Sequence, residues 1–550
     1  MKTKKLTAAM ALAAVAALTL TSCSFDSGKP EGTGSGVPTT LNQIGWGGTT
    51  WTQNFNLFSP TGVSVTPGTA YVYEPLVRMD RTAAGEVLPY LATDWKFNDD
   101  GTQLSFTLRD DVTWSDGEPF TAKDVAYTWN LVLAGETPKV YPFKSVEAPD
   151  DTTVVVTYDD ESYSDLASFA TRQIVPEHIW SKQNVREWTN PEPVGTGPAV
   201  LDKFSPQQIS FSIRDDYWGG ESAGLKQLNM HAVTGDAMRS QVLSGKMDFG
   251  TFGWTNAQEE FVQKDPEVNL YGFYPTGGSD GVIFNTEVAP YNDPHVRRAL
   301  RDALDLETAA KVVAVGYGVP TAAGVAADVF KSQLAEDSEQ NQDVEEAKQE
   351  LAEGGWTVEG GKLVKDGKSY ELRYDVYQPY AEWVSTGTIM ADQWRESLGL
   401  EVTVNQMADA PFTEASTTGD FGMLSGSPLA GNTPYEMFNS VAAISYVPLG
   451  EPAVMNQGRW KNAEFDKLVA ELGGIAPGTD PDRAAELSVG AQEILTDEAP
   501  FIATATAGWK AVANQTRWTG FPVPGKDDYA PNATLPADAV LTIMNLEPRK

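Results

Sequence analysis

A single apolar segment near the start of the chain, residues 6–20, separates a short basic stretch from everything that follows. The segment is too short to cross a bilayer comfortably, but its length and its basic flank are typical of an export signal. No later stretch approaches the ~20 consecutive apolar residues of a membrane helix. The rest of the 550-residue chain must therefore bury its apolar side chains in cores of its own. We expect residues 1–22 to be a signal peptide.

Cys23 is the only cysteine of the sequence and stands directly after this segment. A lone cysteine makes no internal disulfide, so its position calls for another explanation. The run Leu20-Thr21-Ser22-Cys23 resembles the bacterial lipobox, which implies attachment of a diacylglycerol to Cys23 and cleavage before it. The alternative is a free cysteine in a cleaved secretory peptide. Residues 23–39 are small and polar, as in a flexible tether. Because two acyl chains retain a protein firmly, we expect lipid anchoring to the extracellular face of the cell membrane.

The charge of the chain restricts its partners. The sequence has 40 Lys+Arg and 75 Asp+Glu, a net charge of −35. Such an acidic surface argues against nucleic acid and anionic lipid headgroups as main partners. With 41% hydrophobic and 10% aromatic residues, the body is expected to be globular, and its length suits two or three domains.

Short apolar runs alternate with amphipathic stretches, a pattern that predicts an α/β fold. Strands are expected at 41–46, 104–108, 153–158, 247–250, 371–377, 401–405 and 420–424, and helices at 121–133, 294–314, 343–353 and 384–398. Thr121 is the predicted N-cap of one helix, and Gly399 the C-cap of another. Trp114, Trp129 and Trp394 lie within these periodic stretches and are predicted to be core residues.

Four of the predicted strands lead into loops rich in aromatic residues, glycine and amides. They are the strands that end near residues 46, 250, 377 and 424, the last of which leads into a predicted loop at 425–432. In α/β sheets, ligands bind beyond the carboxyl ends of strands. These four loops are therefore where a ligand is expected.

A series of motifs in order along the chain resembles the extracellular solute-binding family 5, which includes oligopeptide, dipeptide, nickel and oligosaccharide receptors of ABC importers. The densest block is 71–125. The motifs are Tyr73-Glu74-Pro75-Leu76, Asp99-Asp100-Gly101, Arg109-Asp110-Asp111-Val112, residues 114–125 (WSDGEPFTAKDV), Val175-Pro176-Glu177-His178, Val194-Gly195-Thr196-Gly197-Pro198, Phe284-Asn285-Thr286 and residues 293–300 (DPHVRRAL). The resemblance covers residues 40–550. Most of the block itself is interpreted as scaffold, because its Asp-Gly pairs are turn formers.

This resemblance implies a two-lobed α/β receptor of the type II periplasmic-binding-protein kind, with an extra subdomain in lobe I. Lobe I is expected at 40–275, with the subdomain at about 61–190. Lobe II is expected at 276–502, and 503–550 return to lobe I. The resemblance also implies hinge closure on a ligand and docking on the membrane permease of an ABC importer. A monomer without cofactor is expected.

The solute is the open question. In peptide-binding members an acidic residue pairs with the peptide amino terminus, and the matching position here is near Leu429 or Ala430. The sequence has no Asp between Asp420 and Tyr435, which weakens the peptide interpretation, since a buried ammonium needs a paired anion. Tryptophans and amides in the strand-end loops suit sugar rings and hydroxyls instead. We therefore expect an oligosaccharide, with a β-linked chain as the first candidate and an oligopeptide or dipeptide as the alternative.

The predicted ligand contacts come from the strand-end loops and their surroundings. They are Trp46, Trp51, Asn54, Trp254, Tyr274, Gln378, Trp383, Ser425, Asn432 and Trp509. Core packing is the competing interpretation for each tryptophan. Trp383 is the first candidate, because it lies between a strand end and a helix start.

Two enzyme motifs match the sequence, but the residues around them argue against an enzyme site. Residues 277–281 match G-x-S-x-G, but a strand follows them where a nucleophile elbow needs a helix, so we interpret them as a flexible crossover. Residues 520–526 match G-x-x-x-x-G-K, but two prolines remove backbone donors and Asp527 replaces the Ser or Thr. The three histidines are far apart, so no metal is expected and a nickel receptor ranks low. A secreted glycosidase and a structural surface protein remain the competing classes.

Overall fold

A computed structural model of the chain describes residues 37–45, 48–59, 65–80, 86–137, 139, 141–313, 318–327, 329, 330, 333–336, 338–476 and 478–549. The compact unit described below is Pro38–Lys550. The predicted signal peptide, Cys23, nearly all of the tether, and Trp46 lie outside the described residues. Among the residues that are described, no helix is long and apolar enough to cross a membrane.

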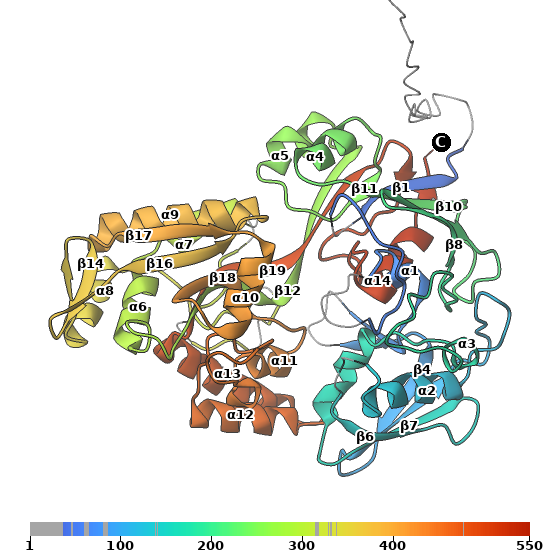
Figure 1. Cartoon of the computed structure of the whole chain (residues 1–550), viewed down its shortest axis with the longest axis horizontal. Coiled ribbons are helices and arrows are strands. Elements are labelled where there is room, and N and C mark those ends of the chain that lie inside the picture. Colours follow the sequence, from blue (N-terminus) through green and yellow to red (C-terminus); the bar gives the residue numbers. More distant parts are fainter. Residues whose placement is uncertain are drawn as a thin grey trace, which may run out of the picture. The chain divides into compact units, whose positions relative to one another are not determined.

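A ten-stranded mixed sheet runs through the unit (Figure 1). Its strands, in spatial order, are β17 (Val402–Met407), β16 (Leu372–Tyr377), β18 (Met423–Leu429), β12 (Asn269–Phe284), β19 (Phe501–Asn514), β11 (Phe249–Gly250), β1 (Thr40–Gly45), β10 (Gln227–Ala232), β9 (Gln208–Ile213) and β8 (Ala199–Ser205). β16 pairs in parallel with β17 and β18, and β1 in parallel with β10 and β11.

The two long strands β12 and β19 connect the halves of this sheet. They pair antiparallel from Asn269↔Asn514 to Ile283↔Phe501, with an irregularity between Pro275 and Ser279. On one side of the irregularity β19 pairs with β11, and on the other β12 pairs with β18. Figure 1 shows the two strands side by side between the halves of the sheet. The chain therefore passes between the halves through two paired strands.

Helices cover both faces of the β16–β18 half. One core cluster joins Val282 and Phe284 of β12 to Trp394 and Met390. The opposite face packs Leu429, Phe501 and Ala503 against a second set of helices. The helices of this half are α6 (Pro294–Asp302), α7 (Leu306–Val313), α8 (Val344–Glu353), α9 (Ala381–Leu398), α10 (Asp409–Thr418), α11 (Pro434–Asn439), α12 (Ala463–Gly473) and α13 (Pro481–Glu498). Apolar residues on alternate faces of the strands account for this helix–sheet–helix layering.

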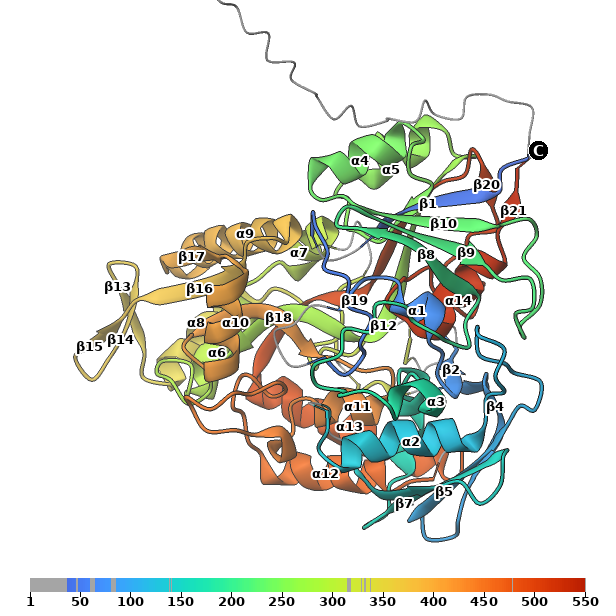
Figure 2. The ribbon, with the colours of Figure 1, turned by 45° about the vertical axis from the view of Figure 1, so that its right-hand side comes forward.

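The other half carries a separate four-stranded antiparallel sheet, with its own core around Phe106, Trp114 and Trp129. Its strands are β4 (Ala92–Phe97), β5 (Gln103–Leu108), β7 (Thr153–Tyr158) and β6 (Phe143–Glu147), and α2 (Ala122–Leu133) and the 3-10 helix Tyr163–Ala170 contact the same core (Figure 2). Short elements complete the unit: α1 (Thr69–Val72), β2 (Val77–Met79), β3 (Val87–Pro89), α3 (Glu177–Trp180), α4 (Asp236–Leu243), α5 (Ala257–Glu260), β13 (Thr357–Glu359), β14 (Lys362–Lys365), β15 (Lys368–Tyr370), β20 (Trp518–Thr519), α14 (Pro536–Met544) and β21 (Glu547–Pro548).

Most of the predicted elements are confirmed to within a few residues. The Asp124 carboxylate accepts a hydrogen bond from the Thr121 backbone at 2.9 Å, so Thr121 does begin α2. Gly399 ends α9 in the left-handed conformation, with φ 71°. Trp114, Trp129 and Trp394 are fully buried, as predicted.

Three local predictions are wrong. The single helix expected at 294–314 is two helices, because the chain breaks after α6 and the side chain of Asp305 caps α7 by accepting from Thr308. Residues 425–429, expected in a loop, belong to β18, where the ladder to β12 extends the strand. Residues 277–281 do lie in the crossing between the halves of the sheet, but as part of strand β12 rather than as the flexible link that was expected.

The family-like motif at 293–300 has a structural role. Arg297 is 2% exposed and donates to the carbonyls of Glu498, Ala499 and Tyr291 at 2.8–3.0 Å, where α13 ends. Burial lowers the pKa of its guanidinium to about 10. The Arg297 side chain therefore donates hydrogen bonds to carbonyls at the end of α13, where the last carbonyls of a helix have no donor within the helix.

Replacing Arg297 by methionine is expected to lower the free energy of unfolding by about 3 kcal/mol, because buried carbonyls would lose charge-assisted donors. Chemical denaturation measures the loss. Lys311→Met is the control, because Lys311 is exposed and pairs with an exposed residue, Glu307, and such surface pairs contribute little to stability. Equal stability of the two variants would contradict this role for Arg297.

Candidate ligand-binding site

Four aromatic side chains gather where β16 ends and α9 begins. The ring centroid of Tyr377 lies 4.9 Å from that of Tyr380 and 5.0 Å from that of Phe412, and Tyr380 lies 5.0 Å from Trp383. We call these four residues the aromatic cluster. Tyr380 is 38% exposed, whereas Trp383 is half-buried and its other side packs on the core beneath α9. The cluster thus presents ring surface at the carboxyl end of a parallel strand, where α/β proteins bind ligands.

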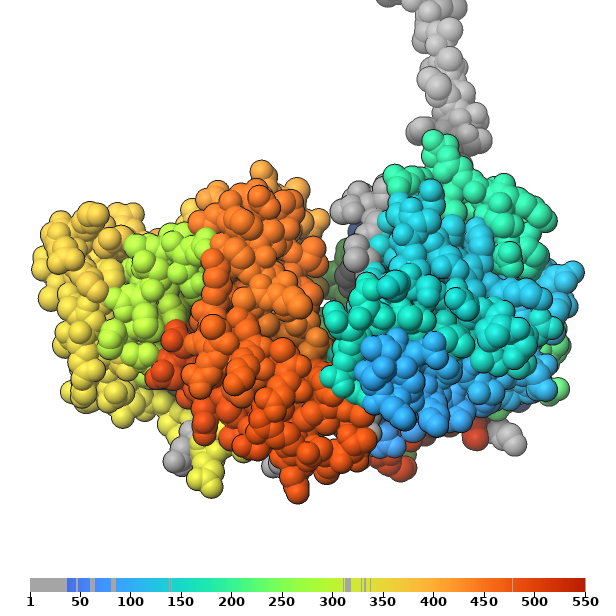
Figure 3. Space-filling view, turned by 90° about the horizontal axis from the view of Figure 1, so that it is seen from below, coloured from blue at the N-terminus to red at the C-terminus, as the bar shows by residue number. Residues whose placement is uncertain are grey.

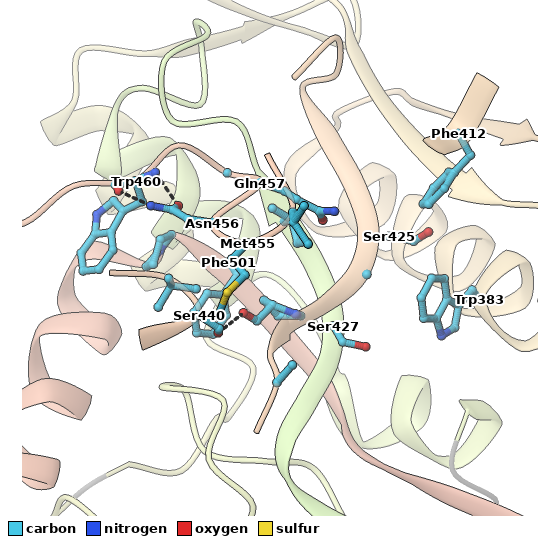
Figure 4. Close-up of a pocket in the computed structure, with 18 residues that line it drawn as sticks. Trp383, Phe412, Ser425, Ser427, Ser440, Met455, Asn456, Gln457, Trp460 and Phe501 are labelled. Atoms are coloured by element: carbon cyan, nitrogen blue, oxygen red, sulfur yellow. Dashed lines mark hydrogen bonds between the residues drawn. The ribbon is translucent and has the colours of Figure 1, made fainter. Parts of the chain in front are cut away.

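A pocket of about 330 Å³ adjoins this cluster. Figure 4 shows Trp383, Phe412 and Ser425 on one side of it, Asn456 and Trp460 on the other, and Ser427 between them. The segments that line it are residues 425–428 of β18, the loop 454–458, and single residues from β12, β19, α9 and α10. Apolar walls with a few hydroxyls and amides are typical of a site that binds a small polar ligand.

The loop 454–458, which forms the far wall of the pocket, is fixed by hydrogen bonds from buried side chains. Arg459 is 1% exposed and donates to the carbonyls of Gln457 and Thr417 at 2.7 Å. Asn456 closes the loop with hydrogen bonds to Trp460 in both directions, at 2.8 and 3.0 Å. The side-chain amide of Gln457 makes no hydrogen bond with any described residue and lines the pocket. It is therefore available to a ligand.

A buried carboxylate lies next to the pocket. Asp280 of β12 is 8% exposed and accepts a hydrogen bond of 2.6 Å from the exposed hydroxyl of Ser427, which lines the pocket. Among the described residues it has no ion-pair partner. Burial raises the pKa of the Asp280 carboxyl, the nearby charge of Lys510 opposes that rise, and the charge of Glu382 adds to it. After burial, the charge of Asp280 also contributes to raising the pKa of Tyr374 and of Tyr380.

This raised pKa predicts how an Asp280→Asn variant behaves. Because the folded-state pKa exceeds the ordinary value of 3.8, the stability tied to the protonated carboxyl is complete below that pH and is lost as pH rises through the raised value. Asparagine imitates the neutral form. We expect the variant to be at least as stable as the parent at pH 7, with the difference vanishing below pH 3.8. Thermal unfolding across this range measures it, and destabilisation at pH 7 would assign Asp280 a structural role.

The structure brings only some of the predicted ligand contacts to this place. Trp383 and Ser425 line the pocket, and exposed Gln378 follows directly on Tyr377 of the aromatic cluster. The Ser425 hydroxyl accepts from the Tyr377 backbone at 3.1 Å, so it positions the end of β16. Asn432 is half-buried beside Glu436, to which its backbone donates at 2.8 Å.

The remaining predicted contacts do not line this pocket. Trp254 and Tyr274 are 1% and 4% exposed and belong to core clusters. Trp51 and Asn54 are 7% and 2% exposed. These four side chains pack inside the protein, and we leave them out of the site proposed below. Trp509 is half-buried opposite Tyr274 on β19.

Several residues of the site were not found from the sequence. Tyr377 and Phe412 are ordinary members of a strand and a helix, and the loop 454–458 has no recognisable motif. The sequence places Asp280 in a predicted flexible crossover and Ser427 in a predicted loop. An aromatic residue at each of positions 377, 380 and 383 was the one available signal.

A second pocket, of about 470 Å³, lies between the four-stranded subdomain and α11–α13. Trp95 and Tyr163 line one side, and Tyr435 and Leu472 the other. Figure 3 shows the face where the blue and cyan residues of the subdomain meet the orange residues of α12 and α13. Within the described ranges, no group of three or more His, Cys, Asp or Glu side chains could hold a metal ion.

Comparison with known proteins decides the family. The sequence profile of the bacterial extracellular solute-binding proteins, family 5, matches residues 86–443. The chain belongs to this family. Its members are substrate-binding proteins of ABC importers, that is, transport receptors that act in the periplasm or outside the cell, and the two-lobed α/β fold is theirs.

Curated relatives of this family 5 protein differ in what they bind. The probable deoxycholate-binding periplasmic protein YgiS of Escherichia coli is 27% identical over 78% of this chain and 82% of its own length. The oligopeptide-binding protein OppA of Bacillus subtilis is 25% identical over 78% of this chain and 81% of its own. Among solved structures, the periplasmic oligopeptide-binding protein of Thermotoga maritima with bound mannohexaose covers 93% of this chain and 99% of its own, with 21% identity and a TM-score of 0.78. That last likeness is one of fold.

Proposed function

We propose that this family 5 receptor captures an oligosaccharide, with a β-linked chain as the first candidate, and delivers it to the permease of an ABC importer. The observation that carries the proposal is the aromatic cluster at the end of β16 beside a pocket with hydroxyl and amide groups.

The chemistry of the cluster suits sugar rings. A pyranose ring has an apolar face of C–H groups that packs on an aromatic ring, and the rings of Tyr380 and Trp383 present such surfaces. The hydroxyls of the sugar need polar partners as they leave water, because unpaired polar groups are costly to bury. Ser427 and the free amide of Gln457 are partners of that kind in the adjoining pocket. The mannohexaose complex of the Thermotoga protein supports the proposal, since this fold accommodates such a ligand.

Titration calorimetry tests the proposal with cello-, manno- and xylo-oligosaccharides against di- to pentapeptides. We expect saturable binding of at least one oligosaccharide series, together with a change in tryptophan fluorescence on closure of the lobes. The sugar must be recovered unchanged, because cleavage would favour a glycosidase. Micromolar or tighter binding of peptides without any response to sugars would contradict the proposal and leave the peptide receptor as the answer.

We also propose that the mature protein is a monomer anchored through a diacylglycerol on Cys23, with lobe I at 40–275 and 503–550 and lobe II at 276–502. The lipobox resemblance supports the anchor, and the paired strands β12 and β19 support the placing of the crossings. The anchor is tested by measuring how much of the Cys23→Ser variant is found in the membrane fraction of cells that express it. Loss of the protein from the membrane is expected, and unchanged retention would contradict lipidation at Cys23.

A further inference from the structure

Asp280 is a carboxyl group that the fold buries beside the pocket. It is 8% exposed, its one side-chain hydrogen bond comes from Ser427, and no cation among the described residues pairs with it. Burying an unpaired charge is costly. A buried carboxyl group with no ion-pair partner among the described residues, next to a pocket, is a candidate for contact with a ligand.

Further carboxylates act on the same cluster. Burial, and then the charges of Glu382, Asp280 and Asp409, raise the pKa of Tyr380. Asp409 accepts a hydrogen bond from the Tyr377 hydroxyl at 2.8 Å. The Glu382 carboxylate makes no hydrogen bond or ion pair with a described residue.

The charge of Lys510 acts against that of Asp280. Lys510 lies on β19, with its ammonium 5.9 Å from the centroid of the Phe273 ring, and forms no ion pair with Asp280. Among these described residues the three carboxylates outnumber the one ammonium group. A cationic group of a ligand would therefore be attracted to Asp280, and it would also interact favourably with the face of the Tyr380 ring.

We propose that Asp280, with Ser427 beside it, is a specificity-determining residue that binds a primary ammonium group of the ligand, so that the oligosaccharide captured by this receptor contains amino sugars with free amines. The inference rests on the proposed function and deepens it. A neutral hydroxyl would satisfy one oxygen of Asp280 but would leave its charge uncompensated, whereas an ammonium group supplies both a donor and a charge. The aromatic cluster holds the sugar ring while Asp280 takes the amine.

Three oligomer series with the same β-1,4 backbone test the proposal: glucosamine, N-acetylglucosamine and glucose oligomers. They differ at carbon 2 alone, which carries an ammonium, an acetamide or a hydroxyl. Calorimetry at pH 6 with pentamers of each is the measurement. We expect the glucosamine series to bind at least tenfold more tightly than the glucose series, and the preference to disappear in Asp280→Asn. Asp392→Asn is the matched control, because it removes the charge of an exposed carboxylate on α9; it should keep the preference.

The outcomes separate the two proposals. Equal binding of the glucose and glucosamine series, or an equal loss of both in Asp280→Asn, would overturn the role of Asp280 while leaving an oligosaccharide receptor intact. Binding of peptides and of no sugar would overturn the proposed function itself, and the inference with it. Because the neutral asparagine is expected to leave the fold intact, unfolding at pH 7 reports whether a loss of binding comes from the site.

Discussion

Replacing Trp383 by alanine is expected to weaken oligosaccharide binding by about 2 kcal/mol, or about thirtyfold in Kd. Its indole lies against the ring of Tyr380 with centroids 5.0 Å apart, and the side chain lines the pocket. Truncation to alanine removes the flat aromatic surface on which the sugar ring is expected to pack. Calorimetry with whichever oligosaccharide binds the parent measures the loss, and Trp383→Phe, which keeps a ring, should recover most of it.

Tyr446→Ala is the control for the loss of an aromatic side chain on the same half of the protein. Tyr446 contacts Lys461 and Glu287 and does not line the pocket, so its removal should change Kd less than about twofold, within the range of an exposed substitution. Thermal unfolding of all three variants separates binding from folding, since Trp383 also packs on the core beneath α9. An affinity of Trp383→Ala within a factor of three of the parent would contradict the aromatic site.

Gly281→Ala is expected to destabilise the protein by about 3 kcal/mol or more, and to reduce its soluble yield. A Cβ at this position would lie 1.9 Å from the carbonyl oxygen of Ile502. That oxygen belongs to β19 within the main sheet, where Gly281 pairs with Ala503, so it cannot move aside without breaking the ladder between the two long strands. This glycine serves close packing of strands, and the G-x-S-x-G match is thereby explained without a nucleophile.

Gly318→Ala gives the matched control, because a Cβ there would meet no atom within 4 Å. Its unfolding temperature should stay within about two degrees of the parent. Differential scanning calorimetry compares the variants. An unfolding temperature of Gly281→Ala equal to that of Gly318→Ala would show that the strands tolerate a side chain at 281, contrary to the close approach described above.

Local signals predicted local structure well. A capping residue such as Thr121 and a glycine at the C-cap position 399 act within one turn of a helix, so the sequence alone places those helix ends. Predictions failed where distant strands decide. Residues 425–429 look like a loop for their Ser, Gly and Pro content, yet they form β18 because β12 lies beside them, more than a hundred residues away in the chain.

The sequence by itself determined the family and the α/β class, since these follow from ordered motifs and local composition, and it marked the segment after residue 377 as a candidate for ligand binding. Only the tertiary structure decided which groups share that place. Ser427 donates a hydrogen bond to Asp280, which is 147 positions away in the sequence, and Trp383 lines the same pocket as residues 454–458. The pairing of β12 with β18 and β19 creates these neighbours, and it also buries Asp280, which has no ion-pair partner among the described residues. A carboxylate 280 residues into an acidic chain gives no sign of that, because its burial belongs to the packed strands around it.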